Sequence, residues 1–494
     1  MYKKKPLLDS AILILLLMLM ANEISAQTIT SENLLRQEVI KLSNDPIMKY
    51  GQLGVCVQSL KTGKVVLSEN AVKNLSPASN LKLLTTGAAL KILGEDYVFK
   101  TVLEYDGELK DSVLSGNIYI TGSGDPTLGS DRYKGYPSSD ELINLWVKKI
   151  KEAGIKKIQG AVIADATVLD LNAVPDFWPW GDMGNYYGAG VFGLNINENL
   201  YRLYFKGTTL GDSARLVKVV PELKNVKIIN EVKTGPAGSG DNAYVYTAPR
   251  SNFISMKGTI PANTDQFTVR GAIPDPPLLC ATLLNTALSN ANIKTSQQPS
   301  VLLTKKDLNS SRKIIHTQNS PSVKEIIKQT NVNSINLNAE VLLRACGLKK
   351  YNSGEIETGI QAVQNFWKQQ GLDITGWFMY DGSGLSANNA ISASQMANAL
   401  YLISKDSVFA SFYASFPIAG QTGTVARIGK GSVAEGNMRV KSGTLSKVIC
   451  YSGYVRTKTG ELYSFSLLSN NYNCSNSVII SRLEKILIKI AEMP

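Results

Sequence analysis

Histidine is almost absent from the sequence: the chain of 494 residues contains one, His316. Zinc hydrolases normally hold their metal with more than one histidine, and a Ser-His-Asp hydrolase would depend on this residue alone. No GxSxG nucleophile elbow accompanies it. We therefore expect His316 to be a surface or strand residue. A hydrolase made from this chain must deprotonate its nucleophile with another group.

Cysteine is sparse as well, and its spacing does not indicate a metal site. The five cysteines are Cys56, Cys280, Cys346, Cys450 and Cys474. They are scattered and form no CxxC pair. In an oxidising compartment one or two disulfides are possible, but the odd number leaves at least one thiol unpaired. The sequence therefore predicts neither a metal nor a cofactor, and it leaves the disulfide pairing open.

Long hydrophobic runs are missing beyond the N-terminus. The run Ala11–Ala21 is too short to span a membrane comfortably, and it follows three lysines at residues 3–5. Small residues, Ser25 and Ala26, come after it. This pattern is typical of a secretory signal. We expect a signal peptide over residues 1–26, cleaved near Ala26, and a mature chain in the periplasm. An uncleaved membrane anchor is the alternative.

A tract of clustered charge is also lacking, although the formal net charge is +12. Scattered positive charge favours attraction to an anionic polymer such as cell wall. Nucleic acid is not an expected partner of an exported protein. The composition is otherwise that of an ordinary globular protein, long enough for two or three packed domains.

A helix beginning near Pro77 and ending at Gly94 brings a serine and a lysine together. Ser79 and Lys82 lie three residues apart in its first turn, so their side chains share one face. The apolar residues after them recur at helical spacing. This arrangement places an amine beside a hydroxyl, as a lysine base requires. The alternative is a serine cap beside a solvated lysine, because SxxK alone is a weak pattern.

A lysine accepts a proton only if its charged form is disfavoured by burial or by a second cation. The hypothesis therefore requires another lysine in the same cleft, together with polar residues that relay protons. Ser334-Ile335-Asn336, followed by a helical pattern, supplies the polar residues. SxN is uninformative alone, since it also occurs at Ser386-Ala387-Asn388 and Ser469-Asn470-Asn471. Its value comes from its order in the chain and its context.

Four tripeptides compete to supply the second lysine. Three are spelled KTG, at residues 61–63, 233–235 and 458–460. The first and third separate pairs of strand-like runs, and the second precedes a loop-like PAGSGDN, so all three are predicted turns. Lys441-Ser442-Gly443 instead lies in NMRVKSGTL, ahead of two more strands and an amphipathic helix. Its position in a strand selects Lys441, and serine keeps the hydroxyl of threonine.

Ser79-x-x-Lys82, Ser334-x-Asn336 and Lys441-Ser442-Gly443, in this order, resemble the motifs of the penicillin-recognising serine enzymes. The 255 residues from Ser79 to Ser334 require a large insertion after the nucleophile helix. That layout is similar to the D-alanyl-D-alanine carboxypeptidases/endopeptidases of the dacB-type low-molecular-mass penicillin-binding proteins. Supporting stretches are TGSGDPTL, WPWGDMGNYYGAG, YDGSGLSANN and FPIAGQTGTVARI. The resemblance covers essentially the whole mature chain.

The resemblance implies an α/β (α+β) fold, in which helices flank the antiparallel sheet of the penicillin-binding and serine β-lactamase-like proteins. Residues 27–94 and 276–494 would form the transpeptidase-like catalytic domain. Residues 95–275 would form one or two inserted β-rich domains, with an unrelated inserted domain as the alternative. The order of early strands, helical middle, late strands and closing helix agrees with this reading.

The resemblance also implies a role for each motif residue in a serine DD-peptidase. Ser79 would attack the D-alanine carbonyl, Lys82 would act as its base, and Ser334 would relay a proton. The residues that would bind the substrate are Asn336, Lys441, Ser442 and Thr444. Peptidoglycan stem peptides would be the substrates and β-lactam antibiotics the covalent inhibitors, with no stable protein partner implied.

Several points stay open at this stage. The aspartates of the insertion, Asp125, Asp165 and Asp182, would either contact the diamino acid of the stem peptide or stabilise turns. A β-lactamase would share the three motifs, although the chain has no YxN triplet and its long insertion disfavours the small serine enzymes. A wall-binding protein with a relic site is the other alternative. The balance of carboxypeptidase and endopeptidase action and the oligomeric state are not decided.

Overall fold

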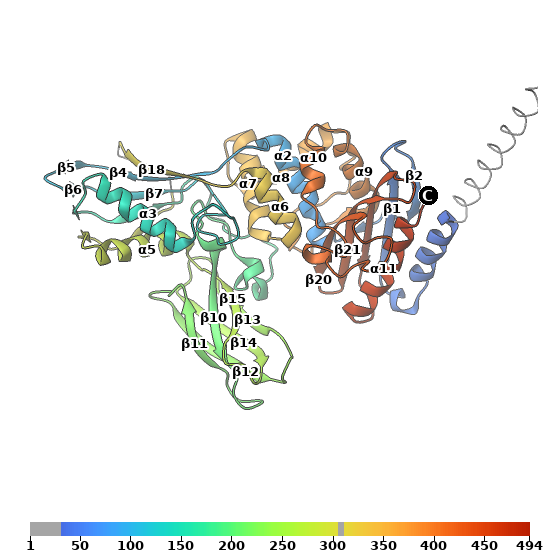
Figure 1. Ribbon diagram of the computed structural model, residues 1–494, viewed down its shortest axis with the longest axis horizontal. Coiled ribbons are helices and arrows are strands. Elements are labelled where there is room, and N and C mark those ends of the chain that lie inside the picture. Colours follow the sequence, from blue (N-terminus) through green and yellow to red (C-terminus); the bar gives the residue numbers. More distant parts are fainter. Residues whose placement is uncertain (1–30, 305–310) are drawn as a thin grey trace, which may run out of the picture.

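The computed structural model describes residues 31–304 and 311–494. The expected signal peptide, residues 1–26, lies outside the described residues. Within them the chain forms three parts: a sheet with helices on both faces, an α/β lobe and a smaller β lobe (Figure 1). Every described helix is too short or too polar to cross a membrane. All five cysteines are free thiols, and four of them are buried.

A five-stranded antiparallel sheet forms the centre of the first part. Its strand order is β2-β1-β22-β21-β20. The strands are β1 (Gln52–Ser59), β2 (Val65–Glu69), β20 (Met438–Leu445), β21 (Val448–Arg456) and β22 (Leu462–Asn470). The three inner strands, β1, β22 and β21, are buried on both faces, because neighbouring residues alternate between two hydrophobic cores. The antiparallel sheet flanked by helices confirms the expected fold class.

Helices cover both faces of this sheet. One face packs against residues 31–43, which are helical, and against α11 (Asn476–Ala491). The opposite face packs against a helical layer (Figure 1). That layer consists of α2 (Lys82–Leu93), α6 (Val323–Asn333), α7 (Asn336–Tyr351), α8 (Ile356–Gln369), α9 (Ala393–Ile403) and α10 (Phe409–Ala414). The short pieces around it are η1 (Pro46–Met48), β3 (Asn74–Leu75), η2 (Ala78–Leu81), β19 (Ile391–Ser392) and η6 (Gly423–Val425).

Helix α2 lies in the middle of this layer and confirms the helix predicted to follow Pro77. It ends at Gly94, as expected from the sequence. Two details differ from the prediction. The first turn, which carries Ser79, is a 3₁₀ turn, and the helix is buried on nearly every side rather than along one apolar face. A helix enclosed by neighbours holds its first turn in a fixed position, which suits a residue that must react.

The inserted chain begins with an α/β lobe. One sheet has the order β17-β9-β7-β4-β18 and the other β16-β8-β6-β5. The helices are α3 (Ser139–Glu152) and α5 (Pro276–Asn290). The strands are β4 (Lys100–Tyr105), β5 (Glu108–Lys110), β6 (Val113–Ser115), β7 (Ile118–Thr121), β8 (Lys157–Ile158), β9 (Val162–Asp165), β16 (Lys294–Thr295), β17 (Ser300–Leu302) and β18 (Lys313–Asn319). His316 lies in β18, so the prediction of a strand residue is confirmed.

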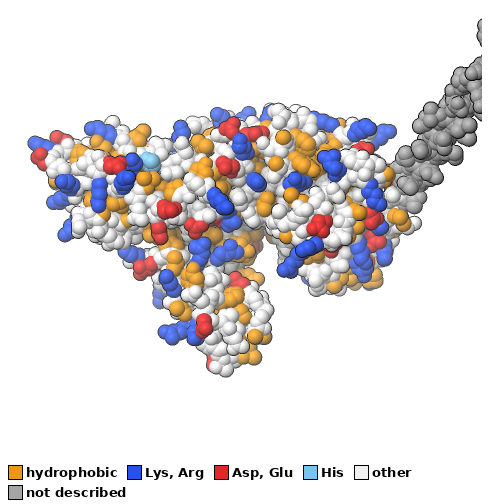
Figure 2. Space-filling view, viewed as in Figure 1, with side chains coloured by type: hydrophobic (Ala, Val, Ile, Leu, Met, Phe, Trp, Pro, Cys, Tyr) orange, Lys and Arg blue, Asp and Glu red, His pale blue; other side chains and the backbone are white. Residues whose placement is uncertain are grey.

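A β lobe is inserted in turn within the α/β lobe. Its two three-stranded sheets have the orders β11-β10-β15 and β12-β14-β13. Its helical pieces are α4 (Trp180–Met183), η3 (Tyr186–Gly188) and η4 (Asn197–Asn199). Its strands are β10 (Leu200–Lys206), β11 (Arg215–Val220), β12 (Lys227–Gly235), β13 (Asn242–Tyr246), β14 (Phe253–Pro261) and β15 (Phe267–Ala272). Basic and acidic side chains are mixed over the face shown in Figure 2, without one basic patch.

The domain boundary differs from the expected one on the C-terminal side. The sequence placed residues 276–494 in the catalytic domain, but strands β16, β17 and β18 of this stretch pair with strands of the inserted lobe. Strand β17 pairs in parallel with β9, and β18 pairs antiparallel with β4. The chain therefore returns to the first domain after Asn319, not at residue 276. The pairing joins segments more than one hundred residues apart, so local sequence pattern did not reveal it.

Candidate active site

The nucleophile candidate lies at the junction of η2 and α2. Ser79 is part of the 3₁₀ turn, and Lys82 is the first residue of α2. The Lys82 Nζ atom lies 3.0 Å from the Ser79 Oγ atom. Lys82 is completely buried, whereas Ser79 is partly exposed and lines a cleft. The hydroxyl is therefore open to a substrate while the amine beside it is shielded from water.

Two further oxygen atoms surround the Lys82 amine. The Asn336 side-chain carbonyl accepts a hydrogen bond from Nζ at 2.6 Å, and the Ser383 main-chain carbonyl accepts one at 2.7 Å. Neither of these atoms can donate a hydrogen, whereas the Ser79 hydroxyl can. A neutral amine has two N–H bonds and one lone pair. With its N–H bonds directed at the two carbonyls, its lone pair faces the Ser79 hydroxyl.

The SxN motif forms the turn between α6 and α7. Ser334 ends α6 in the left-handed conformation, with φ 58°, and Asn336 begins α7. The amide group of Asn336 also donates to the main-chain carbonyl of Tyr187 at 2.7 Å. Tyr187 belongs to the inserted chain, so Asn336 connects the insertion to the Lys82 amine. The structure thus brings the second predicted motif beside the first.

The third motif lies on the edge strand β20, as its sequence context predicted. The Lys441 Nζ atom donates to the Ser334 Oγ atom at 2.9 Å and to the Ser442 carbonyl at 2.7 Å. Gly443 allows this strand to approach η2. A Cβ atom at Gly443 would lie 2.6 Å from the Pro77 oxygen and 3.0 Å from the Ser79 nitrogen. Glycine is therefore required by the close contact of the two backbones.

The three better-spelled tripeptides do not reach this site. Residues 61–63 form the turn between β1 and β2, and residues 458–460 form the turn between β21 and β22, as predicted. The prediction for the remaining tripeptide, residues 233–235, was wrong in detail, because these residues end strand β12 rather than forming a turn. That strand belongs to the β lobe. The loop-like PAGSGDN begins immediately after Gly235, which explains the error.

Burial is the main cause of the low basicity of Lys82. It lowers the pKa of Lys82 to about 7, although the nearby carboxylates of Asp381 and Glu340 raise it. Burial also lowers the pKa of Lys441 well below its ordinary value, and the charge of Lys82 lowers it further. The sequence hypothesis named a second ammonium together with water exclusion. In the structure burial lowers the pKa of Lys82, and the charges that shift it belong to Asp381 and Glu340, which raise it, rather than to Lys441.

A cleft of about 1040 Å³ opens above Ser79. The predicted residues Ser334, Asn336, Ser442 and Thr444 line it together with residues of the insertion. The Ser442 hydroxyl donates to the Thr424 hydroxyl at 2.7 Å, and Thr444 is exposed. All seven predicted site residues therefore lie in or beneath one cleft between the catalytic domain and the insertion.

The three aspartates of the insertion lie in different places. Asp182, in α4, lines the cleft and accepts a hydrogen bond from the Tyr187 hydroxyl at 3.0 Å. Asp125 is buried and bonded to Thr127, and Asp165 is buried and paired with Arg312 at 2.7 Å. Asp125 and Asp165 therefore stabilise the structure of the α/β lobe, and Asp182 alone among them faces the cleft.

Two buried carboxylates, Glu340 and Asp381, were missed by the sequence analysis. They lie close enough to Lys82 to raise its pKa. Asp381 belongs to YDGSGLSANN, a stretch that was noted without any role for its carboxylate. Glu340 follows Asn336 by four residues on α7, and this spacing places both side chains on one helix face. That spacing was the available signal.

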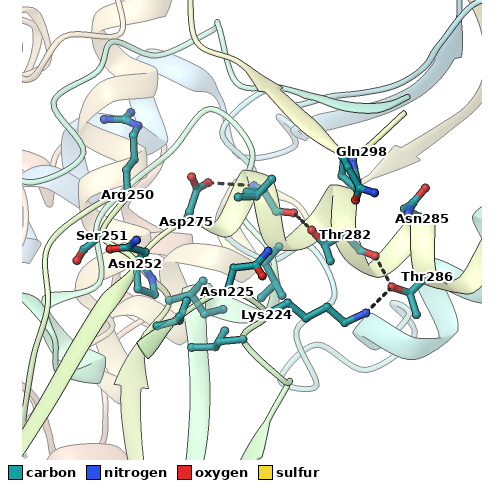
Figure 3. Close-up of a pocket in the computed structure, with 17 residues that line it drawn as sticks. Lys224, Asn225, Arg250, Ser251, Asn252, Asp275, Thr282, Asn285, Thr286 and Gln298 are labelled. Carbon is teal, nitrogen blue, oxygen red and sulfur yellow. Dashed lines mark hydrogen bonds between the residues drawn. The ribbon is translucent and has the colours of Figure 1, made fainter. Parts of the chain in front are cut away.

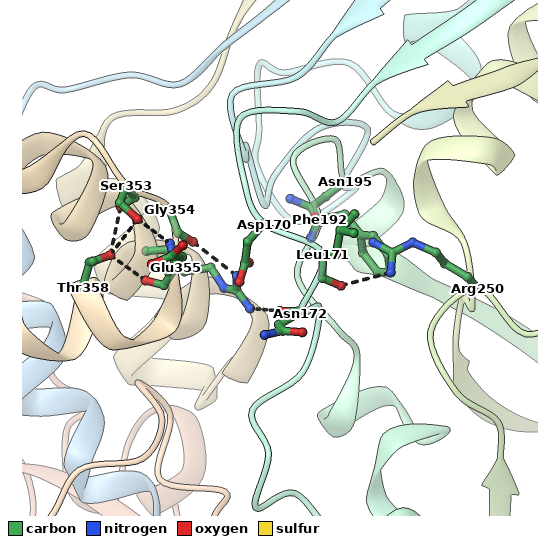
Figure 4. A network of polar contacts seen from close by, with 11 residues as sticks. Asp170, Leu171, Asn172, Phe192, Asn195, Arg250, Ser353, Gly354, Glu355 and Thr358 are labelled. Atoms are coloured by element: carbon green, nitrogen blue, oxygen red, sulfur yellow. Dashed lines mark hydrogen bonds and ion pairs between the residues drawn. The ribbon is translucent and has the colours of Figure 1, made fainter. Parts of the chain in front are cut away.

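A buried guanidinium fastens the insertion to the catalytic domain. Arg344, on α7, pairs with Asp170 and donates to the main-chain carbonyls of Asn172 and Gly354 (Figure 4). Arg250 of the β lobe reaches the same loop from the other side and donates to the Leu171 carbonyl at 3.0 Å. The loop that leads to α4 is thus held from both sides, which fixes the wall of the cleft.

A second cavity of about 380 Å³ lies outside this site. It is found between α5 and the β lobe, where several amide and hydroxyl side chains surround it (Figure 3). None of the motif residues lines it. The catalytic chemistry indicated by the motifs therefore belongs to the cleft above Ser79.

A serine within hydrogen-bond distance of a buried lysine, in a fold whose antiparallel sheet is flanked by helices, is the arrangement expected of a serine hydrolase of the penicillin-recognising class. The sequence pattern of the D-Ala-D-Ala carboxypeptidase 3 (S13) family matches residues 35–487. The chain belongs to this family of serine peptidases.

Individual relatives agree with this assignment. The chain is 26% identical to the D-alanyl-D-alanine carboxypeptidase of Actinomadura sp., over 93% of this chain and 84% of that protein. It is 24% identical to D-alanyl-D-alanine carboxypeptidase DacB of Haemophilus influenzae, over 85% and 86%. The crystal structure of penicillin-binding protein 4 (dacB) from Haemophilus influenzae superimposes with a TM-score of 0.78, at 21% identity, over 93% of this chain and 99% of that one.

Proposed function

We propose that this protein cleaves D-Ala-D-Ala termini, and D-Ala–diamino acid cross-links, of peptidoglycan through an acyl-enzyme on Ser79. The observation that carries this proposal is the meeting of two buried lysines with two serines. Lys82 contacts Ser79 at 3.0 Å, and Lys441 contacts Ser334 at 2.9 Å. Peptidoglycan as substrate is supported by the family and by the activity named for its relatives.

Acylation begins with the Ser79 hydroxyl. Its oxygen forms a bond to the carbonyl carbon of the penultimate D-alanine, and its proton passes to the neutral amine of Lys82. The developing oxyanion accepts hydrogen bonds from the main-chain N–H groups of Ser79 and Thr444, which are commonly worth about 3–4 kcal/mol per donor. The close approach of β20 to η2 at Gly443 supports this pairing of donors.

The leaving amine then receives a proton. Ser334, held by Lys441, faces the cleft and relays this proton: its hydroxyl proton goes to the amine as the C–N bond breaks, and it is replaced by the proton that Lys82 took from Ser79. Asn336 orients Lys82 and accepts a hydrogen bond from the substrate backbone. The hydroxyls of Ser442 and Thr444 bind the terminal carboxylate, whose negative charge favours the protonated form of Lys441.

Hydrolysis of the acyl-enzyme completes the reaction. A water oxygen forms a bond to the acyl carbon while one of its protons passes to Lys82, and the bond to Ser79 then breaks as that proton is transferred to the Ser79 oxygen. When the leaving group is free D-alanine the reaction is carboxypeptidation, and when it is a cross-linked side-chain amine the reaction is endopeptidation. Digestion of purified sacculi, followed by muropeptide analysis, separates the two activities.

Peptidoglycan as substrate places the protein outside the cytoplasm. The basic, apolar and small-residue pattern over residues 1–26 supports export to the periplasm with cleavage near Ala26. Export is tested by N-terminal sequencing of the protein recovered from the cell envelope. A mature chain that begins at Met1 would contradict it.

A penicillin adduct tests the assignment of Ser79. Intact-mass spectrometry after exposure to penicillin should show one covalent adduct on the wild-type protein and none on the Ser79→Ala variant. An adduct that persists on Ser79→Ala would refute the assignment. Rapid turnover of nitrocefin would instead indicate a β-lactamase. Binding of muropeptides without release of D-alanine would indicate a relic site.

A further inference from the structure

The loop from Asp381 to Ser386 wraps around two buried carboxylates. Glu340 accepts hydrogen bonds from the Ser383 N–H at 2.7 Å and from the Gly382 N–H at about 3.0 Å. Asp381 accepts them from the main-chain N–H groups of Gly384 and Ser386 at 2.7 and 2.6 Å. Glu340 is 1% exposed and Asp381 is fully buried. Four main-chain N–H groups of a single loop thus donate hydrogen bonds to two buried carboxyl groups.

This loop supplies one of the two carbonyls that orient the Lys82 amine. The Ser383 N–H donates to Glu340, and the carbonyl of the same residue accepts from Lys82. The other carbonyl belongs to Asn336, which lies one helical turn before Glu340 on α7. One face of α7 therefore controls both acceptors, and the lone pair of the neutral amine is left facing Ser79.

The carboxylates also act on Lys82 through their charge. Glu340 and Asp381 raise the pKa of Lys82, whereas burial lowers it to about 7. Burial and Asp381 raise the pKa of Glu340 to about 7, against the hydrogen bonds of the loop and the charge of Arg344. Lys441 is a further buried titratable group near Lys82, and its own pKa is lowered by burial and by Lys82.

We propose that Glu340 is a positioning residue for the acylation step. Through the Ser383 peptide it directs the Lys82 lone pair at Ser79, and through its charge it stabilises the ammonium that forms when Lys82 takes the proton. This inference rests on the proposed function of Ser79 and Lys82. Glu340 itself touches neither the substrate nor the reacting atoms.

A merely structural role would not require a charge here. Burying a carboxylate is costly unless its bonds and charge are compensated, and a neutral side chain could accept from the same loop. Glu340 is bonded to main-chain donors and not to a side-chain cation among the described residues. Its negative charge is therefore available to the amine that gains a proton.

Two substitutions separate charge from position. Glu340→Gln keeps the shape and an oxygen that can accept from the loop, but it removes the negative charge. Glu340→Asp keeps the charge but withdraws it from the Ser383 N–H by one methylene. The control is Glu357→Gln on α8, where the side chain is exposed. The measured quantity is the second-order rate of acylation by a fluorescent penicillin, from about pH 5 to about pH 9.

Loss of the charge should move the acidic limb of the acylation profile. Glu340 has a pKa of about 7 and is therefore only partly ionised along this limb. Without its charge the pKa of Lys82 falls, so the limb of Glu340→Gln should lie roughly half a pH unit lower than in the wild type. Glu340→Asp should keep the wild-type limb but acylate about tenfold more slowly, because a misplaced base transfers the proton less efficiently. Glu357→Gln should match the wild type in both respects.

Two outcomes would overturn the inference. The first is a Glu340→Gln protein with an unchanged melting temperature and an unchanged acidic limb. The second is a Glu340→Asp protein that acylates as fast as the wild type, and this variant decides the question if Glu340→Gln does not fold. Failure of the proposed function is distinguishable from both, because the wild-type protein would then form no adduct on Ser79.

Discussion

Replacing Gly443 with alanine tests whether the close approach of β20 to the nucleophile turn is needed for catalysis. The added Cβ atom would lie 2.6 Å from the Pro77 oxygen and 3.0 Å from the Ser79 nitrogen, where an ordinary contact begins at 3.4 Å. Both neighbours are main-chain atoms, so neither can rotate away. The strand or the turn must therefore shift by about 0.8 Å, as the shorter contact requires.

The shift would separate the groups that must act together. It moves the Thr444 N–H away from the Ser79 N–H, and it moves Lys441 away from Ser334. A misplacement of about 1 Å can reduce a rate on the order of 10²-fold. We expect Gly443→Ala to acylate with a fluorescent penicillin some 30- to 100-fold more slowly than the wild type, roughly in proportion to that displacement.

The chain offers a matched control in a second tripeptide of the same type. Gly460 follows Lys458-Thr459 and has φ 86°. A Cβ atom added at this glycine would have no other heavy atom within 4 Å. Gly460→Ala should lower the free energy of unfolding by about 1–2 kcal/mol through backbone strain, yet leave the acylation rate unchanged. A Gly443→Ala protein that acylates at the wild-type rate would refute the reasoning, because the two backbones would then not need their present separation.

Three further predictions follow from the same contacts. Lys441→Ala should abolish release of D-alanine from a stem peptide, while Lys458→Ala, in an exposed turn, should leave it unchanged; equal activities would contradict the choice of lysine. Acylation needs the neutral amine of Lys82, whose pKa is about 7, so its rate should fall about tenfold per pH unit below that value and level off above it. A rate independent of pH from about pH 5 to about pH 9 would exclude Lys82 as the base. The indole N–H of Trp178 donates to the buried Asp381 carboxylate at 2.9 Å, and Trp178→Phe removes this donor. The variant should lower the free energy of unfolding, measured by denaturant melts, by about 1–3 kcal/mol. An unchanged midpoint of unfolding would show that the hydrogen bond contributes nothing to stability.

The parts of the site that were predictable from the sequence are local. Ser79 and Lys82 share a helical turn, so their contact follows from spacing alone. Lys441 was distinguishable from Lys61 and Lys458 because a strand-like run surrounds it, whereas turn signals surround those two lysines. The same criterion does not exclude Lys233, which lies in a strand of the β lobe. The order of the three motifs then indicated the family and the fold.

The parts that escaped prediction depend on contacts between distant segments. Glu340 acts through the main-chain N–H groups of Gly382 and Ser383, which carry no side-chain signal. The Tyr187 carbonyl reaches Asn336 from an inserted segment, and any residue type could supply it. The pairing of β18 with β4 likewise joins the first and the last strand of the inserted segment, which lie far apart in the sequence. Sequence pattern describes side chains and periodicity, but it does not reveal which backbones meet.

The two buried lysines are not equivalent, and the difference supports the proposal that Lys82 is the base. Burial lowers the pKa of each, but Lys82 has two carboxylates nearby that raise its pKa, whereas the charged neighbour of Lys441 is Lys82, which lowers it. A proton released inside this site is therefore held more strongly by Lys82 than by Lys441. Lys82 is also the amine that contacts Ser79. The carboxylates thus direct the proton of Ser79 to the lysine beside it, and they leave Lys441 to respond to the charge of an arriving carboxylate.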